Sequence, residues 1–224
     1  MITLAINYKN EKSELCEMGE FYDTDKSPLR KDITDTRHAH AYTPYYNSLF
    51  LSSRGKKLNI CEIGIGPSLL MWQEYFWNSD IYGFDYNQDL LNSFRNKYNT
   101  DRISLSHMDV RDTDIVNSSF ERTGVSYDLI IDDVTQYLDD QLNVIRNAVN
   151  YLNPGGFIIV EDIYTYRDEN DYIEGLGEEV LSNFQKYYFI ELNHTKKFSS
   201  DWNNDKLFVL IKKVTEPVFS QTNF

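Results

Sequence analysis

Cysteine is scarce in this chain of 224 residues, which contains only Cys16 and Cys61. Cys61 lies inside a predicted strand, between Ile60 and Glu62, where it is poorly placed for a disulfide framework. We therefore expect no disulfide-stabilised scaffold and a reduced, cytoplasmic setting.

Basic residues and long apolar runs are also in short supply. The 22 Lys and Arg residues are outnumbered by 35 Asp and Glu residues, which gives a net charge of −13. Because nucleic-acid binding depends on a basic surface, this charge argues against a nucleic-acid partner. No apolar run is long enough to span a bilayer, and the N-terminus lacks the basic and apolar segments of a secretory signal. We therefore expect no membrane partner.

Among only ten glycines, Gly64 and Gly66 stand one residue apart, directly after an apolar run that reaches Glu62. A second apolar run ends about twenty residues later at Asp85, where a βαβ nucleotide site places a carboxylate for ribose hydroxyls. The dinucleotide fingerprint requires a third glycine where Leu69 stands. Two glycines behind an acidic residue instead resemble the signature of class I S-adenosylmethionine-dependent methyltransferases, whose cationic cofactor needs carboxylates more than a phosphate cradle. A plain turn without a ligand is the alternative.

Apolar runs alternate with helical patterns along the chain, which predicts a doubly wound sheet. The last two strands have no crossover helix between them, so they should pair antiparallel. The predicted fold class is α/β, with a Rossmann-like, mostly parallel sheet of seven strands and a C-terminal antiparallel hairpin strand. We expect strands at 56–62, 81–85, 103–108, 127–131, 157–160, 188–192 and 207–211, and helices at 44–50, 69–76, 87–98, 137–152 and 172–184.

The chain is predicted to form a single domain, 1–224. Residues 1–50 form an N-terminal arm that covers the cofactor and substrate cleft, 51–213 form the core, and 214–224 form a loosely held tail. In the arm, Thr43 is predicted to be the N-cap of a short helix with Pro44 in its first turn.

Acidic residues follow five of the predicted strands. Because ligands collect at the carboxyl ends of strands in an open α/β sheet, these residues are candidate site residues. A helix cap is the alternative for any one of them. The residues are Glu62, Asp85, Asp109, the pair Asp132 and Asp133, and the pair Glu161 and Asp162.

Asp133, Glu161 and Asp162 come from neighbouring strands and should lie together. Buried carboxylates repel one another unless a cation lies among them. Oxygen-only ligands suit Mg²⁺, with Mn²⁺ or Ca²⁺ less favoured, and do not suit zinc. Such an ion would lower the pKa of a substrate hydroxyl and orient its oxygen for attack on a methyl group. Helix caps and structural hydrogen bonds are the alternative.

Several motifs together resemble the metal-dependent sugar O-methyltransferases of macrolide biosynthesis, of the mycinamicin and tylosin type. They are also similar to methyltransferase domains attached to glycan-building glycosyltransferases. The resemblance covers about residues 23–212. The motifs are Asp25-Lys26, residues 40–46, residues 62–66, residues 83–85, Ile131-Asp132-Asp133, Pro154-Gly155-Gly156, Glu161-Asp162 and Asp205-Lys206-Leu207.

The resemblance implies that S-adenosylmethionine is the cofactor and that Asp133, Glu161 and Asp162 hold Mg²⁺. The residues implied in cofactor binding are Glu62, Gly64, Gly66, Asp85 and Asp109, with Asp132 beside them.

One departure from the family concerns the base. Gln136 stands where the family commonly has a catalytic histidine, and glutamine cannot accept a proton at neutral pH. Asp133 bound to metal, or His40 or His194, would then take the proton, or the activity is lost. We favour Asp133, because a lowered hydroxyl pKa reduces the strength of base that is needed.

The predicted function is Mg²⁺-dependent methylation of a sugar hydroxyl, on a glycan or a glycosylated product. One alternative acceptor is a catechol-like or polyketide hydroxyl. Another alternative is a non-catalytic cofactor-binding module that has lost its base. The expected partner is a sugar or glycan substrate, and a homo-oligomer or a longer glycan-synthesis protein is left open.

Overall fold

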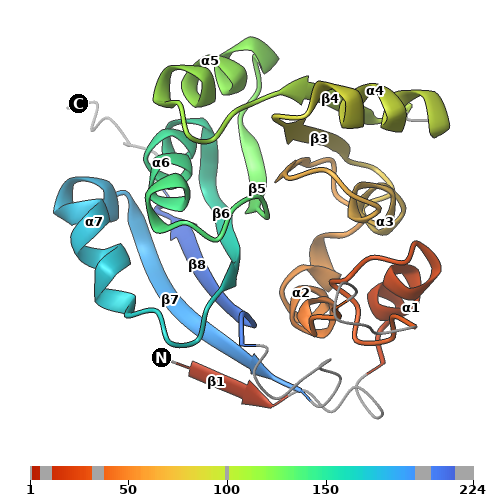
Figure 1. The fold of residues 1–224 in the computed structure, drawn as a ribbon, viewed down its shortest axis with the longest axis horizontal. Helices are drawn as coiled ribbons and strands as arrows, with labels where there is room; N and C mark the ends of the chain where they lie inside the picture. The colour runs from red at the N-terminus through yellow and green to blue at the C-terminus, as the bar shows by residue number, and fades with distance from the viewer. Residues whose placement is uncertain (1, 6–11, 32–37, 99–100, 195–202, 215–224) are drawn as a thin grey trace, which may run out of the picture.

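The computed structural model describes residues 2–5, 12–31, 38–98, 101–194 and 203–214. Within this part of the chain, one sheet of eight strands is flanked by helices (Figure 1). The strands are β1 (Ile2–Ala5), β2 (Asn59–Ile63), β3 (Asp80–Asp85), β4 (Ile103–His107), β5 (Tyr127–Asp132), β6 (Leu152–Ile163), β7 (Phe184–Asn193) and β8 (Lys206–Lys212). The helices are α1 (Glu14–Phe21), α2 (Tyr42–Phe50), α3 (Ser68–Tyr75), α4 (Gln88–Lys97), α5 (Thr113–Thr123), α6 (Leu138–Ala148) and α7 (Glu169–Leu181), with short 3₁₀ turns at Leu51–Ser53 and Val149–Tyr151.

The strand order is β1-β7-β8-β6-β5-β2-β3-β4. All neighbours are parallel except β8, which runs antiparallel to both β6 and β7. The predicted Rossmann-like class and the antiparallel hairpin are therefore confirmed. The chain winds outward in both directions from the adjacent strands β2 and β5, and ligands of such sheets bind where the strand order reverses.

The eighth strand, β1, was not predicted. It pairs in parallel with β7, with Ile2 opposite Ile190, and lies along the outer edge of the sheet in Figure 1. Four residues are too few for a sequence period to distinguish a strand from a loop.

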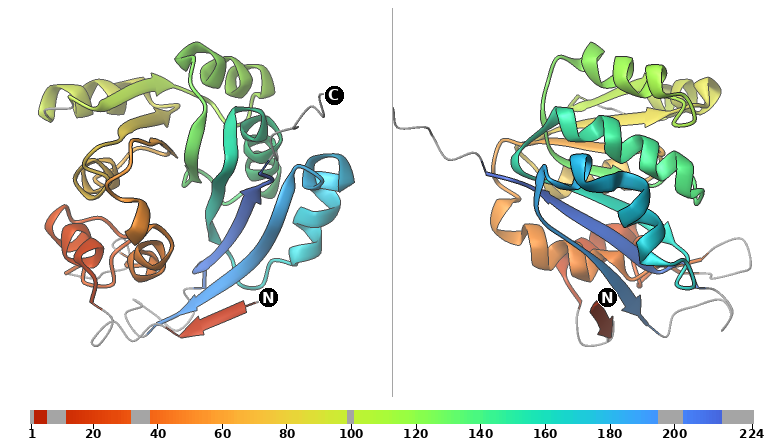
Figure 2. Two further views of the ribbon diagram at one scale, coloured as in Figure 1. Left: turned by 180° about the vertical axis from the view of Figure 1, so that it is seen from behind. Right: turned by 90° about the vertical axis from the view of Figure 1, so that its left-hand side faces the viewer.

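Two hydrophobic clusters hold the helices to opposite faces of the sheet (Figure 2). On β5, Leu129 and Ile131 point into the cluster that α1 to α4 cover, whereas Ile130 points into the cluster that α5, α6 and α7 cover. This alternation follows from the two-residue period of a strand. The central strands are apolar on both faces because both faces are covered.

The predicted N-cap at Thr43 is wrong. Helix α2 begins at Tyr42, and the backbone N–H groups of Tyr42 and Thr43 both donate to the carbonyl of Lys26. The arm itself therefore satisfies the free N–H groups that a cap would otherwise serve. The Thr43 hydroxyl donates instead to the sulfur of Cys16, at 3.2 Å, and both cysteines are buried and free.

Other element boundaries also differ from the prediction. Helix α6 ends at Ala148, and β6 begins at Leu152, so the Pro154-Gly155-Gly156 turn belongs to the first part of a long strand. Helix α7 begins at Glu169 rather than Tyr172 and is interrupted at Gly177, whose φ is 69°. Helices α1 and α5 were not predicted. The predicted tail lies outside the described residues apart from Val214.

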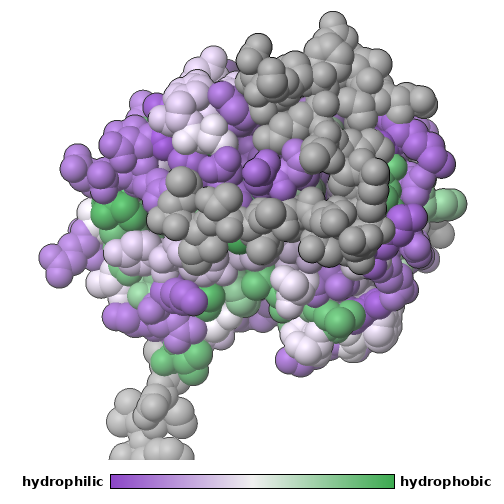
Figure 3. Space-filling view, turned by 90° about the horizontal axis from the view of Figure 1, so that it is seen from below, coloured by the Kyte–Doolittle hydropathy of each residue, from purple (hydrophilic) through white to green (hydrophobic). Residues whose placement is uncertain are grey.

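Figure 3 shows hydrophobic and hydrophilic residues side by side on the described surface seen from below. Large hydrophobic side chains that are exposed are scattered over different elements, among them Phe21 on α1, Trp77 after α3 and Tyr137 before α6. Within the described residues, no helix has the length and apolar character needed to cross a bilayer.

Candidate active site

The glycine turn after β2 lies directly against the chain segment that follows β5. Gly64 has a φ of 95°, and a Cβ there would lie 2.1 Å from the carbonyl oxygen of Asp133. Its N–H donates to the Phe84 carbonyl at 2.8 Å, and the Asp133 N–H donates to the Ile63 carbonyl at 2.9 Å. Position 64 therefore admits only glycine, whereas a Cβ at Gly66 would meet a single atom, 3.7 Å away. The space beside Gly66 is open to a ligand.

Asp85 closes the glycine turn from the end of β3. One of its oxygens accepts from the Ile65 N–H at 3.2 Å, and the other accepts from the Asn87 N–H at 2.8 Å. Asn87 in turn caps α4 by accepting from the N–H groups of Asp89 and Leu90. The carboxylate is thus held at the carboxyl end of β3, in the place predicted for it.

The other candidate cofactor residues have different surroundings. Asp109 is paired with Arg111, which holds the pKa of the Asp109 carboxyl below its usual range. Asp132 is buried on β5, and burial raises the pKa of its carboxyl well above the ordinary value. The pKa shifts of Asp132 and Asp109 are therefore opposite in direction, because Asp132 is buried whereas Asp109 contacts a guanidinium group.

A buried ammonium group joins three of the predicted site carboxylates. Lys26 Nζ donates to Asp133 Oδ2 at 2.6 Å, donates to Glu161 Oε2, and lies 3.3 Å from Glu62 Oε1. Only 1% of the Lys26 side chain is exposed. Burial acts to lower the pKa of Lys26, but the charges of Asp133, Glu161 and Glu62 outweigh it and raise the pKa. The group is an ammonium ion at every physiological pH.

The carboxylates of this cluster outnumber its ammonium group by three to one. Burial raises the pKa of Glu161 to about 7, although Lys26 acts in the opposite direction. Tyr46 donates to the other oxygen of Glu161 at 2.5 Å, and Ser68 donates to Glu62 at 2.8 Å. Burial also raises the pKa of Glu62 and of Asp133, so these carboxylates favour protonation unless a further cation joins Lys26.

Asp162, the third predicted metal ligand, points in a different direction. Its backbone is left-handed, with a φ of 57°, and its carboxylate accepts from the Tyr42 hydroxyl at 2.7 Å. Such a conformation is uncommon for a residue other than glycine and is held here by its surroundings. Asp133 and Glu161 thus converge on Lys26, while Asp162 lies beside Tyr42 and His40.

His40 bridges two carboxylates. Its Nδ1 lies 2.8 Å from Asp205 Oδ1, and its Nε2 lies 3.4 Å from Asp162 Oδ1. Burial acts to lower the pKa of His40, but the charges of Asp162 and Asp205 outweigh it and raise the pKa to about 9. At pH 7 His40 is an imidazolium, which has no lone pair for a substrate proton. In this geometry it is a donor to carboxylates rather than a base.

Gln136 lies on the loop between β5 and α6, where its side-chain oxygen accepts from the Tyr164 hydroxyl at 2.5 Å. It lines a cavity of about 470 Å³, together with Val134, Thr135, Tyr137, Tyr164, Tyr166 and Arg167. The Tyr164 and Tyr166 rings are stacked, with centroids 5.1 Å apart.

A second cavity, of about 310 Å³, lies on the other side of this loop. Tyr86, Asp109, Val110, Arg111 and Asp140 line it, and Val134, Thr135 and Tyr137 line both cavities. Two hollows therefore adjoin at the segment 134–137, one next to the ends of β3 and β4 and one next to the end of β6.

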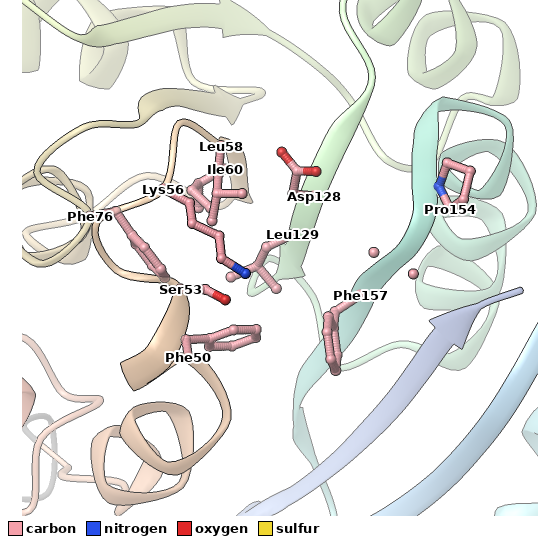
Figure 4. Close-up of a pocket in the computed structure, with 12 residues that line it drawn as sticks. Phe50, Ser53, Lys56, Leu58, Ile60, Phe76, Asp128, Leu129, Pro154 and Phe157 are labelled. Carbon is pink, nitrogen blue, oxygen red and sulfur yellow. The ribbon is translucent and has the colours of Figure 1, made fainter. Parts of the chain in front are cut away.

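A third cavity, of about 140 Å³, lies at the opposite ends of the strands, near the points where β2 and β5 begin (Figure 4). Phe50 and Phe157 face one another there with ring centroids 5.2 Å apart, and Leu58 and Asp128 lie near the starts of β2 and β5. Asp128 accepts from the Asn59 N–H and from Asn153. Its carboxylate therefore serves the fold, and the cavity is far from the predicted site residues.

Several residues of the site were not predicted from sequence as site residues. Lys26 and Asp205 appeared only within motifs, and Tyr42, Tyr46 and Tyr164 had no assigned role. No local pattern marks a lysine that will be buried, because its partners Asp133 and Glu161 lie 107 and 135 residues away in the chain.

The comparisons with known proteins concern the sequence and the fold of the chain. A family model described as a methyltransferase domain matches residues 54–213. Mycinamicin VI 2''-O-methyltransferase from Micromonospora griseorubida is 26% identical over 167 residues, which cover 70% of this chain and 37% of that protein. A tetracenomycin-C rhamnosyl 3'-O-methyltransferase from Streptomyces olivaceus is 28% identical over 135 residues, covering 56% of this chain and 33% of that one.

Among solved structures, the MycE methyltransferase of the mycinamycin biosynthetic pathway, in complex with Mg, SAH and mycinamycin VI, superposes with a TM-score of 0.66. The two chains are 20% identical, and the match covers 93% of this chain and 58% of the other. The match spans about a third of the length of the two curated relatives, 33% of one and 37% of the other.

Proposed function

The chain belongs to the methyltransferase domain family, and we propose that it transfers a methyl group from S-adenosylmethionine to a hydroxyl of a sugar, on a glycan or a glycosylated product. Its fold is that of class I S-adenosylmethionine-dependent methyltransferases. The observation that carries the proposal is the pair of cavities that adjoin at residues 134–137. One suits a cofactor and the other an acceptor.

The cofactor is assigned to the cavity beside Asp109. Gly64 shapes the turn against Asp133, Gly66 is proposed to let the backbone approach the cofactor, and Asp85 is proposed to hold the ribose hydroxyls. The cationic sulfonium and amino groups are attracted by the excess negative charge around Glu62. Tyr86, which is exposed and lines this cavity, offers a flat surface for an adenine ring.

The acceptor is assigned to the cavity beside Gln136. The stacked pair Tyr164 and Tyr166 offers an aromatic face against which a sugar ring can pack, and Arg167 and Gln136 offer donors and acceptors to its hydroxyls. By their names, two of the relatives are O-methyltransferases of rhamnosyl tetracenomycin-C compounds, at the 3' and 2' positions. A catechol-like acceptor would favour a more apolar wall than these residues provide.

Asp133, Glu161 and Asp162 are the residues proposed to hold Mg²⁺, because their oxygens are the ligand type it prefers. Asp133 and Glu161 contact Lys26 Nζ and Asp162 contacts the Tyr42 hydroxyl, so binding of the ion would require Lys26 to withdraw and Asp162 to turn toward the other two carboxylates. The bound ion would supply a lowered pKa for the acceptor hydroxyl. Asp133, whose side chain is 26% exposed, is the carboxylate of the cluster that an acceptor could reach, and it is the proposed proton acceptor. Lys26 holds Asp133 and Glu161 at the ends of β5 and β6.

The Gln136 side chain also favours a second candidate, a module that binds the cofactor without catalysis. Its bond to Tyr164 fixes an amide, not a base, at this position. Methyl transfer to simple glycosides, measured with and without Mg²⁺ beside calorimetric titration with S-adenosylmethionine, distinguishes the two candidates.

Cofactor binding followed by transfer supports the proposal. Binding without transfer to any glycoside favours the non-catalytic module, and no binding contradicts both. We expect Asp85→Asn to weaken cofactor binding at least tenfold, and Asp101→Asn, at an exposed turn, to leave it unchanged.

A further inference from the structure

Three of the four histidines of the chain gather around a single carboxylate, away from the glycine turn. His40 Nδ1, His194 Nε2 and His38 Nε2 lie 2.8, 3.2 and 3.8 Å from Asp205 Oδ1. All four residues are buried, with at most 6% of any of them exposed. Three imidazole nitrogens thus converge on one point inside the protein.

We propose that His38, His40, His194 and Asp205 form a binding site for a divalent transition-metal ion of the zinc class, separate from the carboxylate site proposed for Mg²⁺. Potential ligand atoms of His38, His40 and Asp205 all lie within 4.8 Å of one another. His194, which follows β7, lies outside that group but has its Nε2 3.2 Å from Asp205 Oδ1, and it would supply a fourth ligand after a shift toward the other two histidines. Nitrogen-rich sets with one carboxylate suit zinc-class ions, whereas Mg²⁺ prefers oxygen ligands alone.

Coordination requires a small adjustment of the distances and the release of one proton from His40, which is an imidazolium at pH 7 without the ion. Zinc–nitrogen bonds are about 2.0–2.1 Å long. The three nitrogens surround Asp205 Oδ1, which occupies the position that the ion would take. The carboxylate would therefore move away from that position by roughly one metal–ligand bond length. Asp205 lies in the loop directly before β8, where a side-chain rotation need not move the sheet.

The site would join two parts of the chain that are distant in sequence. His38 and His40 precede α2 in the N-terminal arm, whereas His194 and Asp205 flank the gap between β7 and β8. A bound ion would therefore fasten the arm to the antiparallel hairpin, next to Asp162 at the end of β6. Binding energy of this kind adds to folding stability.

The test uses the full chain without an affinity tag, stripped of metal with a chelator and titrated with Co²⁺, whose visible absorption reports four-coordinate nitrogen ligation. We expect one equivalent to bind, Zn²⁺ to displace it, and millimolar Mg²⁺ to leave it in place. His38→Ala and His194→Ala should each weaken Co²⁺ binding at least tenfold. His107→Ala is the matched control, because His107 is the remaining histidine and lies exposed on β4.

Two measurements distinguish loss of metal binding from misfolding of a variant and from failure of the proposed methyl transfer. In the wild-type chain, Zn²⁺ should shift the NMR signals of three histidine rings and leave His107 unchanged, which requires no variant. Asp133→Asn should retain Co²⁺ binding even if it abolishes methyl transfer. Absence of binding at one equivalent, unchanged affinity in both histidine variants, or a shift of the His107 ring alone would overturn the proposal.

Discussion

The buried Lys26 ammonium gives the sharpest test of the site, through the variant Lys26→Met. Methionine fills a similar volume but leaves Glu62, Asp133 and Glu161 without their shared cation. Breaking a buried ion pair on one side costs about 3–5 kcal/mol, because the remaining charge is uncompensated. We therefore expect Lys26→Met to lower the free energy of unfolding by about 3–5 kcal/mol at pH 7.5.

The loss should depend on pH in a defined direction. The pKa of Glu161 is raised from 4.5 to about 7 in the fold. Each pKa unit is worth about 1.36 kcal/mol, so ionising Glu161 removes up to about 3 kcal/mol of stability as the pH rises from 4.5 through 7. At pH 5 Glu161 is protonated in the fold, and Lys26→Met should then cost about half as much as at pH 7.5.

Urea unfolding at the two pH values measures both effects, through the midpoint and the slope. The control is Lys56→Met, which removes an exposed lysine and should change stability by less than about 0.5 kcal/mol. A loss below about 1 kcal/mol at pH 7.5, or a loss that is the same at pH 5, would refute the view that Lys26 neutralises a buried carboxylate cluster.

Three further predictions concern the turn, a helix end and the arm. Gly64→Ala should lower the free energy of unfolding, measured with urea, by at least about 2 kcal/mol more than Gly124→Ala. Both positions have positive φ, but only at Gly64 would the new Cβ lie 2.1 Å from a backbone oxygen. Equal costs would contradict the packing of the turn. Asp112→Ala should cost about 1 kcal/mol, since Asp112 caps α5 through the N–H groups of Asp114 and Ile115, and Asp112→Asn should restore most of it. The raised pKa of His40, about 9, contributes up to about 3 kcal/mol of stability, which is fully present below pH 6.5 and is lost as the pH rises through 9. His40→Gln should flatten the dependence of thermal stability on pH between 6.5 and 9. An unchanged dependence would contradict the positive charge of His40.

The frame of the site could be predicted because it follows from short-range patterns. Apolar runs fix the strands, and the parallel topology then brings the ends of β2, β3, β5 and β6 to one edge of the sheet. Gly64 is forced by the backbone, and Asp85 is held by the N–H groups of the neighbouring loop. Their proposed roles toward a cofactor remain predictions.

Other elements were missed or misplaced, either because their sequence pattern was weak or because it was not used in the prediction. Helix α5 has an Asp112 cap and ends at Gly124, with a left-handed backbone, both of which are visible in the sequence. The boundary of α2 was wrong for a different reason, because the Lys26 carbonyl that receives its first N–H groups is distant in the chain. The four residues of β1 had no period to read.

The charges of the site could not be predicted because they depend on contacts across the whole chain. Sequence suggested that three carboxylates needed a metal ion, yet the structure brings a lysine to two of them and a tyrosine to the third. His40 illustrates the same limit. As an isolated residue it is a candidate base, but between Asp162 and Asp205 it becomes a cation.

The arm supplies the side chains that balance the acidic ends of β5 and β6. Lys26 reaches the ends of β5 and β6, Tyr46 donates to Glu161, and His40 and Tyr42 hold Asp162. In a chain with a net charge of −13, each buried carboxylate needs a cation or a hydrogen-bond donor in contact with it. Because the same carboxylates are the ones proposed to act on the acceptor, folding of the arm and readiness of the site are coupled. Removing the arm should therefore cost the site its electrostatic balance and also uncover the face of the sheet against which Leu15, Tyr46 and Phe50 pack.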